Sequence, residues 1–200
     1  MLVAIVGGSG AGKTSVAHKI KEHFKTRAEI LSMDDYYADL EEGVDPHSIN
    51  FDSPFSFDLE LFREHLSQLK SNTAIKVPVY NMVTYRREKG EYKLFKPRPL
   101  IICEGLLLLY KKEFRDLFDF SIYIDAQSDE RLIRRIERDT VERGRTLESI
   151  IKQYRKFVAP SFQNFIEPQK YFCDIILPEG VNNRAGLSVI INAIENMIKF

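Results

Sequence analysis

Residues 7–14 read Gly7-Gly8-Ser9-Gly10-Ala11-Gly12-Lys13-Thr14, which fits the pattern G-x-x-x-x-G-K-[ST]. Because glycines let the backbone curl, successive N–H groups of such a loop converge on the β-phosphate of a bound nucleotide. Lys13 adds a positive charge for the β- and γ-phosphate oxygens, and Thr14 offers its hydroxyl to Mg²⁺. The stretch therefore predicts a P-loop in which all eight residues contact a nucleoside triphosphate.

The segments on either side of this loop are those that a P-loop requires. Residues 2–6 form a continuous apolar run, typical of a strand covered on both faces, and residues 13–24 have a helical pattern. Further strands are expected at 30–33, 100–103, 121–124 and 174–177, and helices from Asp58, from about Asp129, from Leu147 and over 185–198. This alternation predicts an α/β P-loop NTPase fold of the nucleoside-monophosphate-kinase-like type, with a mostly parallel sheet flanked by helices in one domain, 1–200.

One segment departs from this alternation. Between about 76 and 97 the chain alternates between apolar and polar residues and contains the turn signal Lys89-Gly90. A β-hairpin that leaves the main sheet is expected there, with its turn at Lys89-Gly90.

The composition indicates a globular domain that binds neither nucleic acid nor membranes. The chain has 200 residues, of which 44% are hydrophobic, and 29 Lys and Arg balance 29 Asp and Glu. The apolar run at the N-terminus is too short for a signal peptide, and Glu104 interrupts the most apolar stretch, 100–110. A cytoplasmic location is expected, with Cys103 and Cys173 as buried free thiols.

The motifs that are absent narrow the class of P-loop protein. A GTPase switch requires D-x-x-G and N-K-x-D, but no glycine has Asp three positions before it and no Asn precedes Lys. The chain is also too short for a large motor ATPase. A kinase that uses ATP and Mg²⁺ on a small molecule is favoured, and a nucleotide-binding regulator that hydrolyses slowly is the alternative.

Acidic residues follow several predicted strands, where ligands of parallel sheets bind. Asp34 follows the second strand and is a candidate base that accepts a proton from an attacking hydroxyl. Glu104 interrupts an apolar run, where a carboxylate is costly unless it lies near a cation, and is a candidate Mg²⁺ ligand beside Thr14. Asp125 could take the same role but is interpreted as the entry to the next helix.

The inner motifs resemble those of the uridine–cytidine kinase family, in the same order and at similar spacing along nearly the whole chain. The resembling segments are Leu31–Tyr37, Asn50–Pro54, Val77–Tyr80, Glu104–Gly105, Arg138–Arg145 and Gln153–Pro160. The resemblance implies phosphorylation of uridine or cytidine at the 5′-hydroxyl, with ATP and Mg²⁺. Phosphoribulokinase and pantothenate kinase share the scaffold but match these segments less well, so a kinase with another acceptor stays open.

The resemblance also implies roles for individual residues. Asp34 would be the catalytic base and Asp52 would bind the ribose hydroxyls. Further substrate-binding residues would be Tyr80, Tyr85, Arg135, Arg138 and Gln153. A helical lid over about 138–150 would bring the catalytic Arg143 and Arg145 over the phosphate, while Lys13 acts from the P-loop. The family is commonly tetrameric, which implies a homo-oligomer.

The helix from about Asp129 carries four arginines on one face. The basic face comprises Arg131, Arg134, Arg135 and Arg138, and the opposite side comprises Leu132, Ile133 and Ile136. For Arg131 and Arg134 a solvated surface, partly paired with Glu130 and Glu137, is expected. Histidines 18 and 65 are likewise expected on helix surfaces.

The predicted hairpin departs from the usual family pattern at two positions of the base pocket. Tyr80 is retained, but Met82 replaces an aromatic ring and Tyr85 replaces a histidine. A thioether stacks on a base less well than a ring does, and a phenol is longer than an imidazole. These changes bear on the choice between uridine and cytidine rather than on phosphoryl transfer.

Overall fold

The structure is a computed structural model that describes residues 1–40 and 43–198. The strands are β1 (Leu2–Val6), β2 (Ala28–Ser32), β3 (Ile75–Asn81), β4 (Arg86–Phe95), β5 (Leu100–Gly105), β6 (Phe120–Asp125) and β7 (Ile175–Pro178). The helices are α1 (Lys13–Phe24), α2 (Leu59–Lys70), α3 (Lys112–Arg115), α4 (Ser128–Val141), α5 (Leu147–Gln153), α6 (Ala159–Ser161) and α7 (Arg184–Ile198). Each predicted strand and helix is present, with ends that shift by a few residues.

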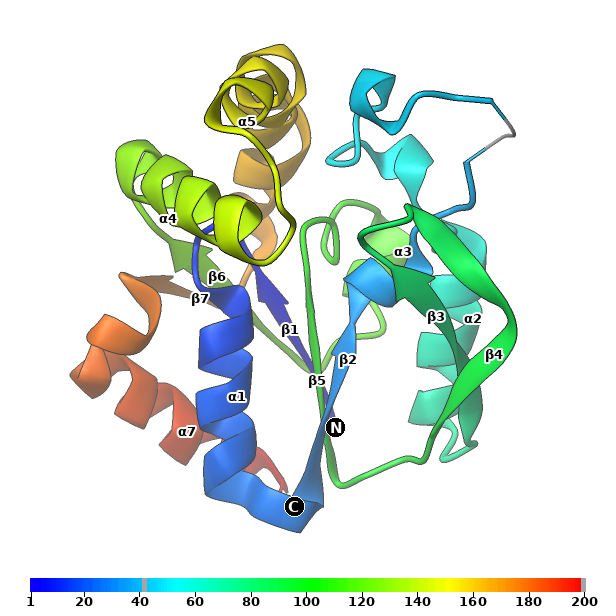
Figure 1. The fold of residues 1–200 in the computed structure, drawn as a ribbon. Coiled ribbons are helices and arrows are strands. Elements are labelled where there is room, and N and C mark those ends of the chain that lie inside the picture. Colours follow the sequence, from blue (N-terminus) through cyan, green and yellow to red (C-terminus); the bar gives the residue numbers. More distant parts are fainter. Residues whose placement is uncertain (41–42, 199–200) are drawn as a thin grey trace.

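The main sheet confirms the predicted fold class. Its strand order is β2-β5-β1-β6-β7, and every neighbouring pair is parallel. The helices α1 and α7 cover one face, while α2 and the β3–β4 hairpin lie on the other side (Figure 1). The carboxyl ends of the strands point toward α4 and α5, so the residues that follow the strands meet at that edge.

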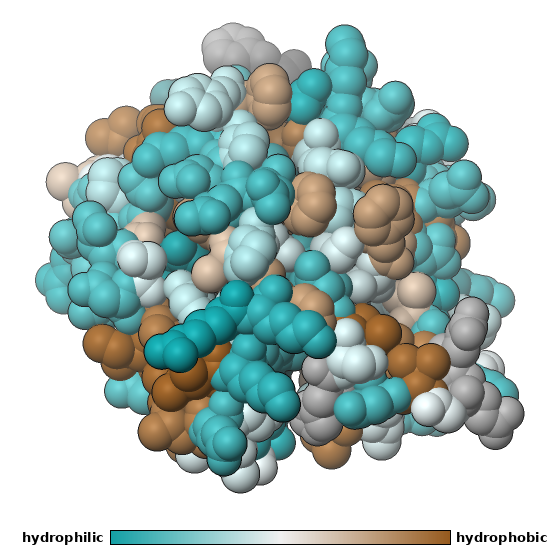
Figure 2. Space-filling view, turned by 90° about the horizontal axis from the view of Figure 1, so that it is seen from above, coloured by the Kyte–Doolittle hydropathy of each residue, from teal (hydrophilic) through white to brown (hydrophobic). Residues whose placement is uncertain are grey.

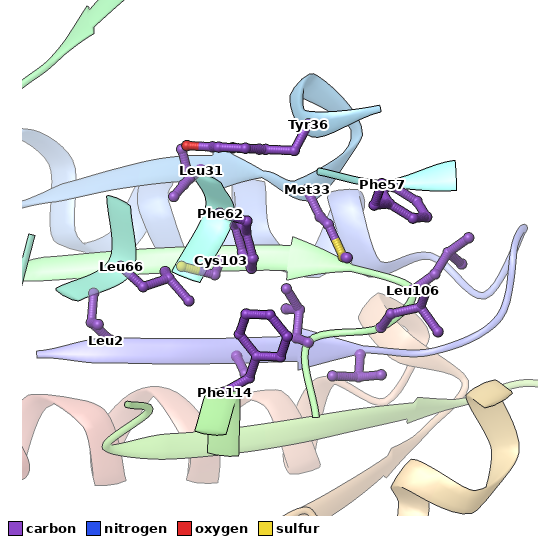
Figure 3. Close-up of a cluster of buried hydrophobic side chains, with 14 of the residues drawn as sticks. Leu2, Leu31, Met33, Tyr36, Phe57, Phe62, Leu66, Cys103, Leu106 and Phe114 are labelled. Atoms are coloured by element: carbon purple, nitrogen blue, oxygen red, sulfur yellow. The ribbon is translucent and has the colours of Figure 1, made fainter. Parts of the chain in front are cut away.

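Strand β1 shows why the chain folds into layers. Leu2, Ala4 and Val6 face a core that includes Phe62 and Leu66 of α2, with Cys103 of β5 in the same cluster (Figure 3). The intervening residues Val3 and Ile5 face a second core built with α1 and α7. A continuous apolar strand is required because both of its faces are buried.

The β3–β4 hairpin turns at a different place from the predicted one. Asn81 pairs with Arg86, so the turn is formed by residues 82–85 rather than by Lys89-Gly90. The register shifts between Pro78 and Tyr80, which leaves Lys89-Gly90 in an irregular part of β4. Gly90 has a φ of 79°, which suits such a bulge as well as a turn and misled the sequence-based prediction.

The segment after α5 is a nearly continuous run of helix that the sequence pattern did not predict in full. Helix α5 continues through π-helical turns at Tyr154–Val158 and Phe162–Ile166, with α6 between them, and then through a 3-10 segment, Glu167–Phe172. Within it, the Gln169 amide donates to the carbonyl of Leu106 and accepts from the N–H of Leu109. The run is thereby fixed to the segment that follows β5.

Two sequence-based expectations about side-chain exposure need correction or refinement. His65 is buried in α2 rather than exposed, because its Nδ1 lies 2.8 Å from the Tyr36 hydroxyl and so has a polar partner inside the core. Cys103 and Cys173 are both free, but only Cys103 is fully buried. Among the described residues, no helix has the length and apolar character needed to span a membrane.

Contacts of Arg87 and Asp58 attach the hairpin to the body of the protein. The Arg87 guanidinium donates to Asp58 Oδ2 at 3.2 and 3.3 Å and, through Nε, to the Tyr37 carbonyl at 2.9 Å. Asp58 also caps α2, since its Oδ1 accepts from the Leu61 N–H at 3.1 Å, as predicted. One carboxylate therefore starts a helix and holds the hairpin beside it.

Two substitutions separate these functions of Asp58. Asp58→Ala removes both and should lower the free energy of unfolding by about 1 kcal/mol for the cap, with up to about 1 kcal/mol more for the partly exposed ion pair. Asp58→Asn keeps a capping oxygen and loses only the charge, so it should cost less than half as much. Urea unfolding midpoints measure both, and equal losses would contradict a separate capping contribution.

Candidate active site

The P-loop lies between β1 and α1, as the sequence predicts. Gly10 and Gly12 have φ values of 77° and 94°, in the left-handed region that favours glycine. A Cβ at Gly10 would lie 2.3 Å from the backbone oxygen of Arg131 in α4, so that helix packs directly on the loop. Lys13 as a whole is 9% exposed, and its ammonium group donates to the Gly8 carbonyl at 3.1 Å.

A single pocket collects the predicted site side chains at the carboxyl edge of the sheet. Hydrophilic residues cover most of the corresponding face of the molecule (Figure 2). The pocket is lined by Ser9, Lys13, Thr14, Asp34, Asp52, Tyr80, Tyr85, Glu104, Arg135, Arg138, Arg143, Arg145 and Gln153, together with Tyr37, Phe51, Met82 and Leu106. The predicted residues outside this lining are Gly7, Gly8, Gly10, Ala11 and Gly12, which form the loop beneath Lys13.

Three carboxylates, Asp34, Asp52 and Glu104, form one side of the pocket and are called the carboxylate set. Glu104 is the penultimate residue of β5 and lies opposite Ser32 of β2, whose hydroxyl donates to its Oε1 at 2.8 Å. Burial and the neighbouring Asp34 raise the pKa of Glu104, while Lys13 and hydrogen bonds from Ser32 and Thr14 oppose that rise. A buried carboxylate and the Thr14 hydroxyl are hard oxygen donors of the kind that hold Mg²⁺.

Asp52 is 5% exposed and lies in the loop before the 3-10 segment at Pro54–Ser56. Its Oδ2 has no hydrogen-bond partner among the described residues. Burial raises the pKa of Asp52, and the nearby Arg135 and Lys13 only partly offset that effect. Such an unpartnered buried acceptor is costly to keep, and it is suited to binding a hydroxyl group of a ligand.

Four arginines, called the arginine cluster, line the same pocket as the carboxylate set. They are Arg135, Arg138, Arg143 and Arg145. Arg135 donates to the Ser9 hydroxyl of the P-loop at 2.7 Å and to Gln153 Oε1 at 2.8 Å, and Arg145 donates to the same oxygen at 2.6 Å. The buried Nε of both Arg135 and Arg145 lacks a hydrogen-bond partner among the described residues. The cluster therefore brings four positive charges to the pocket, which suits an anionic ligand.

The basic face of α4 points into the protein, so the expected solvated position of Arg131 is wrong. Arg131 is 3% exposed, its guanidinium lies 3.7 Å from the centroid of the Phe162 ring, and its Nε donates to the Ala126 carbonyl. Ile133, on the opposite side, is 51% exposed. The Phe162 ring and the Ala126 carbonyl both contact the buried guanidinium of Arg131. The helical periodicity of the sequence does not reveal these tertiary contacts. Arg134 pairs with Glu130 at 3.3 Å, near the surface as expected.

The remaining end of the pocket is aromatic, and part of it was missed from the sequence. Phe51 stacks on Tyr85 with ring centroids 5.2 Å apart and an interplanar angle of 27°, and Tyr37 lies 5.2 Å from Tyr80. Phe51 lies in the Asn50–Pro54 segment that carries the family resemblance, which was the available signal. Phe51 lines the same pocket as Met82 and supplies an aromatic ring, which Met82 does not have.

Comparison with known proteins shows the family of this chain. The family model described as "Phosphoribulokinase / Uridine kinase family" matches residues 2–185, which include every residue of the pocket. The chain belongs to this family. A family member, the uridine kinase of Listeria monocytogenes serotype 4a (strain HCC23), is 39% identical over 202 residues, covering 100% of this chain and 96% of that protein.

Two other similar proteins differ more in length or sequence. Uridine-cytidine kinase A of Dictyostelium discoideum is 40% identical and covers 100% of this chain, which matches 40% of that longer protein. The structure of the phosphoribulokinase from Rhodobacter spheroides aligns with a TM-score of 0.66 at 15% identity, covering 88% of this chain and 69% of that one. The structural match supports the fold.

The charge of Asp52 should destabilise the ligand-free protein. Because folding raises its pKa, the cost of its charge is fully present at pH 7 and disappears as the pH falls toward about 4, the unfolded value. Asp52→Asn should therefore raise the melting temperature at pH 7 and raise it less at pH 5.

Asp116→Asn is the matched control, since that carboxylate forms an exposed pair with Lys112. It should change the melting temperature little at either pH. A lower melting temperature for Asp52→Asn at pH 7 would contradict the stated cost of its buried charge.

Proposed function

We propose that the protein transfers the γ-phosphate of ATP to the 5′-hydroxyl of a pyrimidine nucleoside, uridine or cytidine, to give UMP or CMP. The observation that carries this proposal is the pocket itself, which is lined by cationic, acidic and aromatic side chains. Lys13 and the arginine cluster suit a triphosphate, the carboxylate set suits hydroxyls and a metal ion, and the aromatic end suits a flat base. The relatives named uridine kinase, 39% identical over the whole chain, support it.

Residues of the cationic side stabilise the transferring phosphate. Lys13 is the first residue of α1 and lines the pocket. Its ammonium group donates to the Gly8 carbonyl. The four guanidinium groups of the cluster line the same pocket and suit the charge that spreads over the equatorial oxygens during transfer. Arginine forks match this distribution of charge better than a point charge alone.

Residues of the carboxylate set act on the acceptor and on the metal. Asp34 is the base that takes the proton of the attacking 5′-hydroxyl, and Asp52 binds ribose hydroxyls through its two oxygens. Thr14 and Glu104 would hold Mg²⁺, which neutralises developing charge on the phosphates. The buried Glu104 carboxyl fits this role, because a cation compensates a charge that burial otherwise disfavours.

The choice of acceptor provides the test of this function. Coupled ADP release should depend on uridine or cytidine and should be near background with purine nucleosides, ribulose 5-phosphate or pantothenate. Lys13→Ala should abolish the nucleoside-dependent rate without unfolding the protein. ADP formation that is independent of every acceptor would instead favour a regulator that hydrolyses slowly.

The roles of Asp34 and Asp52 predict different kinetic defects. Asp34→Asn keeps the size of the side chain but cannot accept a proton, so kcat should fall by about 10²- to 10⁴-fold with little change in the KM for ATP. Asp52→Asn should act mainly by raising the KM for the nucleoside. Steady-state kinetics with both substrates varied measure the two effects.

Asp35→Asn is the control for these variants. Asp35 is adjacent to Asp34 but pairs with Lys93 and does not line the pocket. Its kinetic constants should stay close to those of the parent. If Asp52→Asn mainly lowered kcat and Asp34→Asn mainly raised the nucleoside KM, the two roles would have to be exchanged.

Tyr85 is proposed to influence which base is used. A histidine can donate to the 4-carbonyl of uracil or accept from the 4-amino group of cytosine by changing tautomer. A phenol whose oxygen is held as an acceptor suits the amine, so the parent should have the higher kcat/KM for cytidine. Tyr85→His should narrow the difference.

Tyr92→His controls for the chemical change itself, since Tyr92 is exposed on β4 and does not line the pocket. It should leave the preference of the parent unchanged. Equal use of both nucleosides by the parent, or no effect of Tyr85→His, would show that Tyr85 does not read the base.

A further inference from the structure

Asp139 is a buried carboxylate surrounded by the arginine cluster. Its side chain has no exposed surface. Arg138 donates to Oδ1 through Nε at 2.9 Å and Nη2 at 2.8 Å, and Arg145 Nη1 donates to Oδ2 at 3.4 Å. Arg135 Nε and Arg143 Nη1 lie 3.6 Å from its two oxygens. One carboxylate thus contacts all four arginines of the site, although Asp139 does not line the pocket itself.

The fold brings these groups together at the end of α4. The chain turns at Gly144, which has a φ of 62°, and the Arg145 N–H donates to the Asp139 carbonyl at 3.0 Å. This turn brings Arg143 and Arg145 back to the Asp139 carboxylate of α4. Through Arg135 the same carboxylate is connected to Ser9 of the P-loop. Asp139 is therefore the group common to the lid arginines and the phosphate loop.

Electrostatics explain why a carboxylate is needed at this point. Four guanidinium groups at such short separations repel one another, most strongly where water is excluded. Burial raises the pKa of Asp139, but the charges of Arg135, Arg138 and Arg143 outweigh that effect and lower it. The carboxylate therefore stays ionised at neutral pH. One negative charge among four positive ones holds the cluster together and leaves an excess of positive charge facing the pocket.

We propose that Asp139 is a positioning residue that holds the arginine cluster in the arrangement required for phosphoryl transfer. This inference rests on the proposed kinase function. Asp139 does not contact the reacting atoms. It fixes the orientations of the four guanidinium groups that line the pocket before substrate binds.

Asp139→Asn tests this role because it keeps the shape of the side chain and removes its charge. We expect kcat to fall by about 10²-fold, the usual effect of misplaced catalytic groups. The Kd of ADP, held mainly by the P-loop, should change less than about threefold. Glu137→Gln is the matched control, since Glu137 is an exposed acid on the same helix, and it should behave like the parent. A parent-like kcat for Asp139→Asn would overturn the proposal.

A double-mutant cycle separates positioning from a general loss of structure. Arg143→Gln is made in the parent and in Asp139→Asn. If Asp139 positions Arg143, the second substitution should lower kcat much less in Asp139→Asn than in the parent. Independent effects that multiply would contradict positioning.

Asp139→Glu extends the test if Asp139→Asn does not fold. It keeps the charge but moves it by one methylene, so kcat should fall at least about tenfold with ADP binding retained. A kcat equal to that of the parent would overturn the proposal. Failure of the kinase proposal would look different, because the parent itself would then show no nucleoside-dependent ADP release.

Discussion

The buried ammonium group of Lys13 is the constraint on which the rest of the site depends. It lies at the first residue of α1, where the P-loop ends, and burial lowers its pKa. Glu104 and Asp34 partly oppose that effect. The lysine in turn offsets part of the rise that burial causes in the pKa of Glu104. The start of α1 and the end of β5 are thus linked by two charges, each of which would be costly to bury alone.

The rest of the pocket likewise contains cationic and anionic side chains that are not fully paired with one another. Asp52 keeps an oxygen without a hydrogen-bond partner among the described residues, and one carboxylate, Asp139, is shared by four arginines. These groups reduce the stability of the ligand-free protein and are available for substrate groups of complementary charge. Functional sites commonly carry such local costs, which the surrounding cores of the sheet offset.

The fold could be predicted from the sequence because its determinants are local. The P-loop pattern, the apolar run at 2–6 and the cap at Asp58 each specify their own segment. The hairpin turn could not be placed, because Gly90 suits a bulge as well as a turn, and only the pairing of Asn81 with Arg86 distinguishes the two. Strand register depends on distant partners rather than on a local signal.

The charged residues of the candidate site could be predicted from the sequence, whereas several of their contacts could not. Asp34, Asp52 and Glu104 stand out because an acid beside an apolar strand or in a tight loop requires a reason. Arg131 was assigned to the solvent, because periodicity does not show that Phe162 lies above it. The role of Asp139 depends on four arginines that meet only after Gly144 reverses the chain. Tertiary contacts of this kind have no local sequence signal.

The central claim is that this pocket transfers phosphate to a nucleoside instead of to water. Phosphorus NMR of the products formed from ATP, Mg²⁺ and a uridine–cytidine mixture tests it most directly. We expect ADP and a nucleoside 5′-monophosphate in equal amounts, with little inorganic phosphate. ADP together with an equal amount of inorganic phosphate, and no nucleoside monophosphate, would contradict it.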